Sequence, residues 1–526
     1  MKHTDVLHRY LPDHSAEKRG NTLLVAVATD EIRDVIRTLT RASLPLVTMF
    51  AADERTKHGG FRVYYVFGLP AQASASGESF FIVPFITLAN TTFPSLAREF
   101  PGFALYEREI MTMFGLTPLG HPDPRTLILH EENWPKEMHP LRKDFMWNTR
   151  IPETKSGTYA FNTVGGEGIY EIPVGPVHAG IIEPGHFRFS VAGEEIVSLE
   201  ARLGWVHKGI EKLFEILPLE KKVFLSEHIS GDSSFSHSLG FCEALETLTE
   251  TKVPARARYL RLVFAELERL TMHFFDIGNI AGNGTGFSFM ASHGFRMTEQ
   301  MRAMNETLVG HRYLRGVNTP GGVTKDVTPE RAVELLHFLS SLKQDFAEMI
   351  RIANGSASLG NRLKGTGVLS LEVARDHGAL GIAARACNIP KDARIEYPYA
   401  AYKDIRPEIV LDKAGDVEAR FHVRIREVFK SFDLIEKSLA AIPTGAIHTE
   451  LRPLPEESSA VSAVESWRGE IAYVVQAIDG VISRVKVRDP SFINWQLFPH
   501  MVGTDMVPDF PLINKSLNLS YTGNDL

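Results

Sequence analysis

Six long segments with helical periodicity constrain the fold of this chain more than any other feature. In each, apolar residues recur at three- and four-residue spacing over lengths typical of helices rather than strands. The segments are Leu199–Leu217, Phe224–Glu250, Ala255–Asn279, Phe295–Arg315, Pro329–Ala353 and Ala419–Ile442. Two short strand-like pieces lie outside these segments, at Pro184–Val191 and Gly469–Ala477. The pattern predicts a mainly α-helical bundle with small β decorations over residues 171–526.

The first 147 residues show a different pattern, in which strand and helix signals alternate. Strands are predicted at Asn21–Ala28, Leu46–Ala51, Phe61–Leu69 and Phe80–Ile86, and helices at Asp30–Arg41 and Phe103–Phe114. Residues 148–170 are rich in Thr, Gly and Pro, which predicts a linker. The expected fold class is therefore α+β, with a small α+β domain at residues 1–147 joined to the helical domain.

Composition excludes several classes of function. The 526 residues are 44% hydrophobic, which is enough for more than one buried core. A net charge of −7 without a long basic run argues against nucleic-acid binding. The two cysteines, Cys242 and Cys387, cannot build a disulfide framework or a cysteine-based metal site, and they fit a reducing cytoplasm. The N-terminus lacks the apolar core of a signal peptide, and apolar stretches such as Phe80–Ala89 are too short to span a bilayer.

Three motifs end the first domain: Tyr106–Gly115 (YEREIMTMFG), Gly120–Arg125 (GHPDPR) and His139–Phe145 (HPLRKDF). Each alone could be a solvated helix face followed by turns. In this order they resemble the signature of the 30-kDa subunit of respiratory complex I, with Thr112 in place of the usual aspartate. The resemblance implies a docking element rather than a catalytic one. Its candidate docking residues are Glu107, Arg108, Glu109, His121, Asp123, Arg125, His139, Arg142, Lys143 and Asp144.

A second constellation, Gly175–Phe189 (GPVHAGIIEPGHFRF), could be no more than a tight turn entering a strand. It resembles the start of the complex I 49-kDa subunit and of group 4 membrane-bound hydrogenase large subunits. The complex I branch implies that His178 lies near a quinone head group, to which an imidazole can donate a hydrogen bond. The hydrogenase branch implies that Glu183 relays protons, which a buried carboxylate with a raised pKa can do.

A third constellation concerns a metal site. His228–His237 (HISGDSSFSH) resembles the R-x-C-G-x-C-x-x-x-H loop of nickel–iron hydrogenase large subunits, and Asn518–Gly523 (NLSYTG) matches their C-terminal D-P-C-x-x-C. The four cysteine positions hold Ser230, Ser233, Ser520 and Gly523. Soft metals such as nickel need thiolate sulfur, so no metal bound by this chain is expected. The vacated space is expected to be roomy, with hydroxyls that need water or a polar ligand.

His237 falls where the 49-kDa branch carries a tyrosine that contacts quinone, which weakens the quinone hypothesis. NAD binding comes with the family resemblance, but Gly282–Gly286 lacks the strand–turn–helix context of a dinucleotide site, so a turn is expected there. Matches such as Leu199–Lys212, with its H-x-G-x-E-K core, extend the resemblance from about residue 20 to the end of the chain.

Three hypotheses of function remain open. In the first, the chain is the large subunit of a hydrogenase-related, complex I-like assembly. It takes part in electron or proton transfer near His178, Glu183 and His237, and quinone is one possible electron acceptor. The resemblance implies an iron–sulfur small subunit that carries the cluster, antiporter-like membrane subunits, and peripheral association with the cytoplasmic side of the membrane through these partners. In the second, the chain is a non-catalytic coupling scaffold. In the third, it is a hydrogenase with an atypical metal site.

Overall fold

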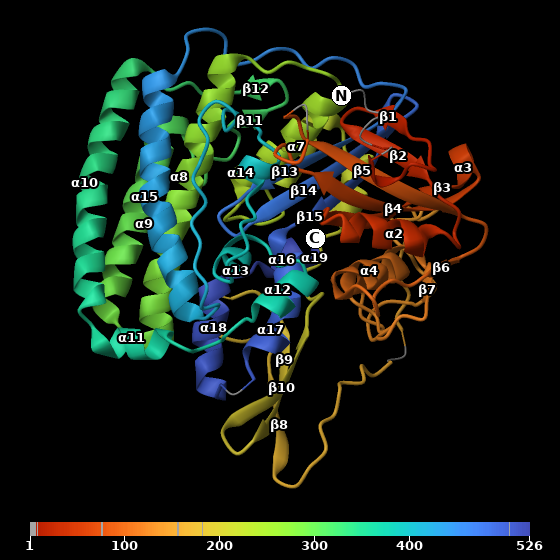
Figure 1. Ribbon diagram of the computed structural model, residues 1–526, viewed down its shortest axis with the longest axis horizontal. Coiled ribbons are helices and arrows are strands. Elements are labelled where there is room, and N and C mark those ends of the chain that lie inside the picture. Colours follow the sequence, from red (N-terminus) through yellow and green to blue (C-terminus); the bar gives the residue numbers. More distant parts are fainter. Residues whose placement is uncertain (1–6, 8, 75–76, 155–156, 181, 504) are drawn as a thin grey trace.

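The computed structural model describes residues 7, 9–74, 77–154, 157–180, 182–503 and 505–526. Parts of the predicted N-terminal domain and of the predicted linker, and Ile181 of the second constellation, lie outside these residues. Figure 1 shows the N-terminal sheet at one side of the molecule and the long helices at the other, with a C-terminal three-stranded sheet between them. The α+β class is confirmed. No helix within the described ranges is both long and apolar enough to cross a membrane.

The N-terminal sheet has the strand order β1-β2-β5-β4-β3, in which only β2 and β5 run parallel. Its strands are β1 (Glu17–Arg19), β2 (Thr22–Ala26), β3 (Leu46–Glu54), β4 (Gly60–Leu69) and β5 (Phe80–Leu88). One face packs on α2 (Ile32–Arg41) and α4 (Ala104–Phe114), and the other packs on the C-terminal sheet. Because both faces are covered, the strands are apolar almost throughout rather than alternating.

Four long helices lie side by side in the second domain: α8 (Ala255–Asn279), α9 (Ser288–Val309), α10 (Pro329–Asn354) and α15 (Val417–Ala441). Capping residues begin two of them. The Thr328 hydroxyl accepts from the N–H of Arg331 at the start of α10, and the Asp416 carboxylate accepts from the N–H of Ala419 at the start of α15. The sequence pattern predicted all four helices, with ends displaced by a few residues.

Two three-stranded sheets also belong to the second domain. The first, in the order β10-β9-β8, contains β8 (Ile169–Val174), β9 (His186–Ala192) and β10 (Glu195–Arg202). The second is antiparallel and contains β13 (Glu457–Glu465), β14 (Glu470–Ile478) and β15 (Val481–Arg488), with α7 (Ser234–Leu248) packed against it. The sequence predicted one strand of each sheet, and the last two residues of the predicted linker belong to β8.

The predicted helix Leu199–Leu217 is wrong. Residues 199–202 complete β10, where Leu199 and Ala201 pair with Phe189 and Phe187 of β9. A helix, α5 (Ile210–Ile216), starts only after Gly209, whose φ of +68° is a left-handed conformation that ends regular structure. The predicted helix Phe224–Glu250 is likewise divided into α6 (Leu219–Ser226) and α7, and the loop between them carries two of the four vacated cysteine positions, Ser230 and Ser233.

The remaining elements are short. The glycine-rich stretch after α8 is a π-helical turn, η2 (Ile280–Gly284), between two helices. The other helical elements are η1 (Pro101–Phe103), α3 (Arg55–His58), α11 (Ala357–Leu363), α12 (Leu371–Asp376), α13 (Gly381–Arg385), α14 (Ala393–Glu396), α16 (Pro490–Asn494), η3 (Trp495–Leu497), α17 (Phe498–Met501), η4 (Val507–Asp509), α18 (Phe510–Leu517) and α19 (Tyr521–Asp525). The other strands are β6 (Thr92–Pro94), β7 (Thr117–Leu119), β11 (Asn318–Thr319) and β12 (Gly322–Val323).

Candidate functional site

The α6–α7 loop and the C-terminal segment 518–523 meet, although they are far apart in sequence. The hydroxyls of Ser230 and Ser520 lie 2.9 Å apart across a separation of 290 residues. Ser520 also caps α19, because its hydroxyl accepts from the N–H of Gly523 at 2.9 Å. The fold therefore gathers the vacated cysteine positions at one place, which we call the degenerate site: Ser230, Ser233, Ser520 and Gly523.

An ion pair from a different element is part of the degenerate site. Arg468, in the turn between β13 and β14, donates to both carboxylate oxygens of Asp232 at 2.7 and 2.6 Å. The same guanidinium lies 3.4 Å from the hydroxyl of Ser230 and 3.3 Å from that of Ser233. The expectation that the hydroxyls need water or a polar ligand is therefore wrong, because Asp232, Arg468 and Ser520 already serve as their partners.

A carboxylate stands where a side chain at position 523 would go. A Cβ atom built on Gly523 would lie 2.7 Å from the carboxyl carbon of Asp489 and 2.8 and 2.9 Å from its oxygens. Asp489 is fixed there by the N–H of Ser491 at 2.7 Å and by Nε2 of His237 at 3.1 Å. Burial opposes ionisation of Asp489, yet the hydrogen bond from His237 holds its pKa below the ordinary value.

These residues do not fit a thiolate-bound nickel–iron centre. Hydroxyls and a glycine replace the sulfur ligands, and Arg468 places a positive charge beside two of the four positions. Restoring a cysteine at position 523 would require Asp489 to move. Across the described part of the chain, no group of three or more His, Cys, Asp or Glu side chains has an arrangement that could hold a metal ion.

The connection between β8 and β9 brings two more predicted site residues to the C-terminal segment. Nε2 of the half-buried His178 lies 3.4 Å from the hydroxyl of Tyr521, and burial and the nearby Lys515 lower the pKa of this histidine. A carboxylate oxygen of Glu183 accepts from the N–H of Thr522 at 3.1 Å. His237, fully buried, reaches the segment through Asp489. The three candidate residues thus come from two elements, the β8–β9 connection and α7, to the same C-terminal segment.

Comparison with known proteins shows which family the chain belongs to. Residues 284–457 and 452–525 match the family described as respiratory-chain NADH dehydrogenase, 49 Kd subunit, and residues 25–150 match its 30 Kd subunit. Hydrogenase-4 component G of Escherichia coli (strain K12) is 33% identical over 488 residues, which cover 91% of this chain and 83% of the relative. The chain belongs to the complex I 30-kDa/49-kDa family.

Two other relatives and one solved structure fill in the family. Formate hydrogenlyase subunit 5 of Escherichia coli (strain K12) is 32% identical, covering 91% of this chain and 84% of the relative. A carbon monoxide-induced hydrogenase of Rhodospirillum rubrum is 33% identical, covering 66% of this chain and 97% of the relative. The fold resembles a chain of an archaeal membrane-bound sulfane sulfur reductase, with a TM-score of 0.64, 24% identity, and coverage of 68% of this chain and 99% of that one.

Four of the ten candidate docking residues of the 30-kDa-like domain contact the chain's own 49-kDa-like domain. Lys486 of β15 donates to both carboxylate oxygens of Glu109 at 2.7 and 2.6 Å. Arg125 donates to Glu200 at 2.7 Å. The other two contacts are Lys143 with Glu215 at 3.0 Å and the carbonyl of Arg142 with Lys212 at 3.0 Å. In this fused chain the 30-kDa-like motifs therefore join the two domains to each other.

The other six hold the 30-kDa-like domain's own loops. Glu107 accepts from Ser95 and from the N–H of Leu96, and burial raises its pKa to about 7. The remaining five also have partners inside this domain. Arg108 contacts the carbonyl of Arg125 and the carboxylate of Asp123, and His121 contacts the carbonyl of Ala104. Asp123 pairs with Arg125, His139 contacts the carbonyl of Thr112, and Asp144 pairs with Arg55. These contacts lie within the 30-kDa-like domain, and docking to a partner stays a prediction for these residues.

Sequence reasoning missed three residues that lie at or beside the degenerate site: Arg468, Asp489 and Tyr521. Asp489 and Tyr521 lie inside motifs that carry the family resemblance, but nothing in a motif shows where a side chain points. Arg468 follows a strand that the sequence did not predict at all. Only the packing of β13–β15 against α7 brings it to the α6–α7 loop.

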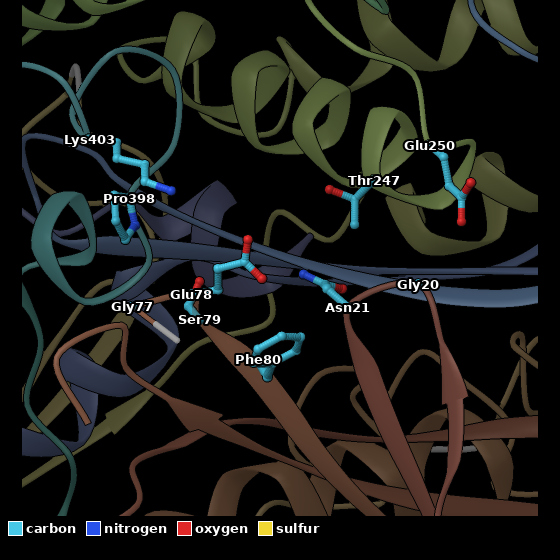
Figure 2. Close-up of a pocket in the computed structure, with 10 residues that line it drawn as sticks. All are labelled: Gly20, Asn21, Gly77, Glu78, Ser79, Phe80, Thr247, Glu250, Pro398 and Lys403. Carbon is cyan, nitrogen blue, oxygen red and sulfur yellow. The ribbon is translucent and has the colours of Figure 1, made fainter. Parts of the chain in front are cut away.

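A cleft of about 290 Å³ lies elsewhere, between the two domains. The β1–β2 turn and the start of β5 form one side of it, and the end of α7 and residues 398–403 form the other. In Figure 2 the carboxylate of Glu78 points into the space between Lys403 and Thr247. The cleft shares no lining residue with the degenerate site.

Proposed function

We propose that this chain is the large subunit of a membrane-associated, complex I-like redox assembly that works without a nickel–iron centre. The observation that carries the proposal is the pairing of Asp489 with Gly523: the carboxylate fills the place of the fourth ligand's side chain. The Arg468–Asp232 ion pair supports the proposal. Thiolates at these positions would need a metal cation to balance their charge, whereas here the guanidinium of Arg468 provides the positive charge beside the serines.

The proposed partners are an iron–sulfur small subunit and antiporter-like membrane subunits, with the chain on the cytoplasmic side of the membrane. Relatives named as components of hydrogenase-4 and of formate hydrogenlyase support such an assembly. Two exposed apolar side chains beside the site, Val177 and Phe224, support a protein partner there, since such residues gain from being covered. Val177 precedes His178, and the Phe224 ring lies 4.2 Å from that of His228.

Within this proposal the chain's own residues handle protons beside the partner's electron carrier. The Tyr521 hydroxyl faces Nε2 of His178, and the lowered pKa of His178 keeps a neutral imidazole that can accept a proton there. Further inside, His237 links the Tyr473 hydroxyl at 3.0 Å to the carboxylate of Asp489. This buried chain holds Asp489 against Gly523 and keeps the interior of the site polar but fully paired.

The decisive experiment is metal analysis of the assembly purified with this chain in it. We expect iron from the partner subunit's cluster and nickel far below one atom per chain. Stoichiometric nickel would overturn the proposal in favour of a hydrogenase with an atypical metal set.

A second candidate function is reduction of a quinone at the same place, and one observation favours it. The tyrosine that is absent at position 237 has a counterpart in Tyr521, whose hydroxyl approaches His178 from the C-terminal segment. A quinone head group needs such polar donors together with apolar walls, and the Tyr521 ring packs against Phe187 and Trp495. Quinone reduction by an assembly carrying His178→Ala tests this, and unchanged turnover would rule out the quinone site.

A purely structural role is the remaining alternative. It predicts that the assembly forms and turns over normally when His178, Glu183 and His237 are each replaced. Loss of turnover in an assembly that keeps all of its subunits would exclude it.

A further inference from the structure

The hydroxyls at the degenerate site are joined in a line. The hydroxyl of Thr522 lies 3.3 Å from that of Ser520, which lies 2.9 Å from that of Ser230. The Ser230 hydroxyl in turn lies 2.8 Å from a carboxylate oxygen of Asp232. Three links therefore connect the C-terminal segment to the α6–α7 loop through side-chain oxygens.

The two ends of this line are more exposed than its middle. Ser230 and Ser520 are buried, with exposed fractions of 2% and 5%. Thr522 is half-buried, and its backbone N–H donates to the carboxylate of the half-buried Glu183 at 3.1 Å. At the other end the Asp232 side chain is 30% exposed. The line thus runs through the interior of the site and reaches a partly exposed carboxylate at each end.

The donors and acceptors along the line give its hydroxyl protons one direction. An ionised carboxylate only accepts, and a hydrogen bond to it is stronger than one to a neutral hydroxyl, so Ser230 donates to Asp232. Ser230 then accepts from Ser520. The two lone pairs of Ser520 accept from the N–H of Gly523 at 2.9 Å and from the Thr522 hydroxyl. Each hydroxyl therefore donates once, toward Asp232, as conduction of a proton along the line requires.

We propose that Thr522, Ser520, Ser230 and Asp232 form a proton wire that crosses the degenerate site. The inference rests on the proposed function, since only a site without a metal leaves these side chains free to bond to one another. It deepens that function by giving the protons handled near Glu183 a path between two of the vacated cysteine positions.

The wire moves a proton by exchange of O–H bonds. A proton that arrives at the Thr522 oxygen releases the proton already there to Ser520. Ser520 releases its own proton to Ser230, which releases its proton to Asp232. One O–H bond forms and one breaks at each hydroxyl, and no electrons are transferred. Burial opposes ionisation of Asp232, yet the Arg468 guanidinium holds its pKa below the ordinary value. The partly exposed carboxylate therefore passes the proton on to solvent rather than keeping it.

The test measures hydroxyl exchange by nuclear magnetic resonance in the full-length chain, labelled with carbon-13 at the Cβ of serine. In a mixture of light and heavy water, a slowly exchanging hydroxyl gives two Cβ signals, one for each hydrogen isotope, whereas rapid exchange merges them. We expect the Ser520 hydroxyl to exchange rapidly despite its burial. The matched control is Ser516, which is also buried and donates to the carbonyl of Ile513, and its hydroxyl should exchange slowly.

Substitutions on either side of Ser520 distinguish a wire from local opening of the site. Thr522→Val closes one end, but the Ser520 proton can still leave through Ser230, so exchange should remain rapid. Thr522→Val combined with Ser230→Ala closes both sides. Exchange should then slow at least about tenfold, because only local opening releases the proton. Ser230→Thr in place of Ser230→Ala keeps a hydroxyl there and should keep exchange rapid.

Slow exchange of Ser520 in wild type would overturn the inference, as would slow exchange in Thr522→Val alone or rapid exchange in the variant closed on both sides. Circular dichroism establishes that each variant is folded. If one is not, Thr522→Ala and Ser230→Val remove the same hydroxyls and carry the test. The assay needs neither a metal nor turnover, so its failure leaves the proposed function standing. Stoichiometric nickel in the purified assembly would sink the proposed function without changing the exchange result.

Discussion

The domain interface and the degenerate site both contain buried charges, but the two places hold their carboxylates differently. At the interface, Lys486 pairs with Glu109 and also lies 3.2 Å from Glu211, and Arg484 donates to Glu211 at 2.7 Å. Two cations there meet two carboxylates. Near the degenerate site Arg468 pairs with Asp232, whereas the buried carboxylate of Glu268 is held by hydrogen bonds from the N–H groups of Phe235 and Ser236. Paired buried charges stabilise a structural contact, whereas a buried carboxylate that has no cation beside it resists ionisation.

The largest effect should come from breaking the balanced cluster. Lys486→Met leaves Glu109 and Glu211 buried without their shared cation. We expect a loss of about 3–5 kcal/mol in the free energy of unfolding, measured by denaturant titration. Lys437→Met, which removes an exposed lysine of α15, should change it by less than about 0.5 kcal/mol. A small loss in Lys486→Met would mean that the two domains are held together mainly by apolar contact.

A pH series would sharpen the comparison at Glu268, which accepts hydrogen bonds from the N–H groups of Phe235 and Ser236. Burial raises the pKa of Glu268 to about 7, against 4.5 for the unfolded chain. Between these values the folded state keeps a proton that the unfolded state loses, so the free energy of unfolding falls as pH rises and levels off above about 7.

Glu268→Gln removes this dependence. Relative to wild type, the variant should gain up to about 3 kcal/mol in unfolding free energy between pH 5 and pH 8. The exposed Glu436→Gln on α15 serves as the control. A difference that does not vary with pH would show that Glu268 ionises normally.

Gly523→Ala tests whether Asp489 really occupies the place of a fourth ligand. Its new Cβ would meet the Asp489 carboxylate at 2.7–2.9 Å, which should cost about 1–3 kcal/mol of overpacking. Asp489→Ala in the same chain should relieve the clash, so the two substitutions should be strongly non-additive in a double-mutant cycle. Additive losses would contradict this arrangement.

The smallest effect should come from Ser230→Ala. It removes the hydroxyl contacts with Asp232 and Ser520, each a single hydrogen bond, and should cost about 1 kcal/mol. Thermal unfolding measures it, with Ser458→Ala on β13 as a half-buried control. A loss of several kcal/mol would mean that the degenerate site is as structural as the interface.

Sequence periodicity predicted the four long helices of the 49-kDa-like domain and the central strands of the 30-kDa-like domain, because their patterns extend over many residues. It failed where a pattern was interrupted. Leu199–Leu217 contains both the end of β10 and the start of α5, and its first residues are a strand because they pair with β9. Strands β13 and β15 were missed because their residues are buried on both faces and show little alternation.

By itself, the sequence determined that the chain belongs with the 30-kDa and 49-kDa subunits and that four thiolate positions hold Ser230, Ser233, Ser520 and Gly523. Those facts are written in motifs, whose residue types need no folding to be recognised. Only the tertiary structure decided what stands in their place. Arg468 and Asp489 come from the turn before β14 and the end of β15, and their contacts with the α6–α7 loop and Gly523 exist because the C-terminal sheet packs against α7. Such close approaches depend on distances between remote residues, which local patterns do not encode.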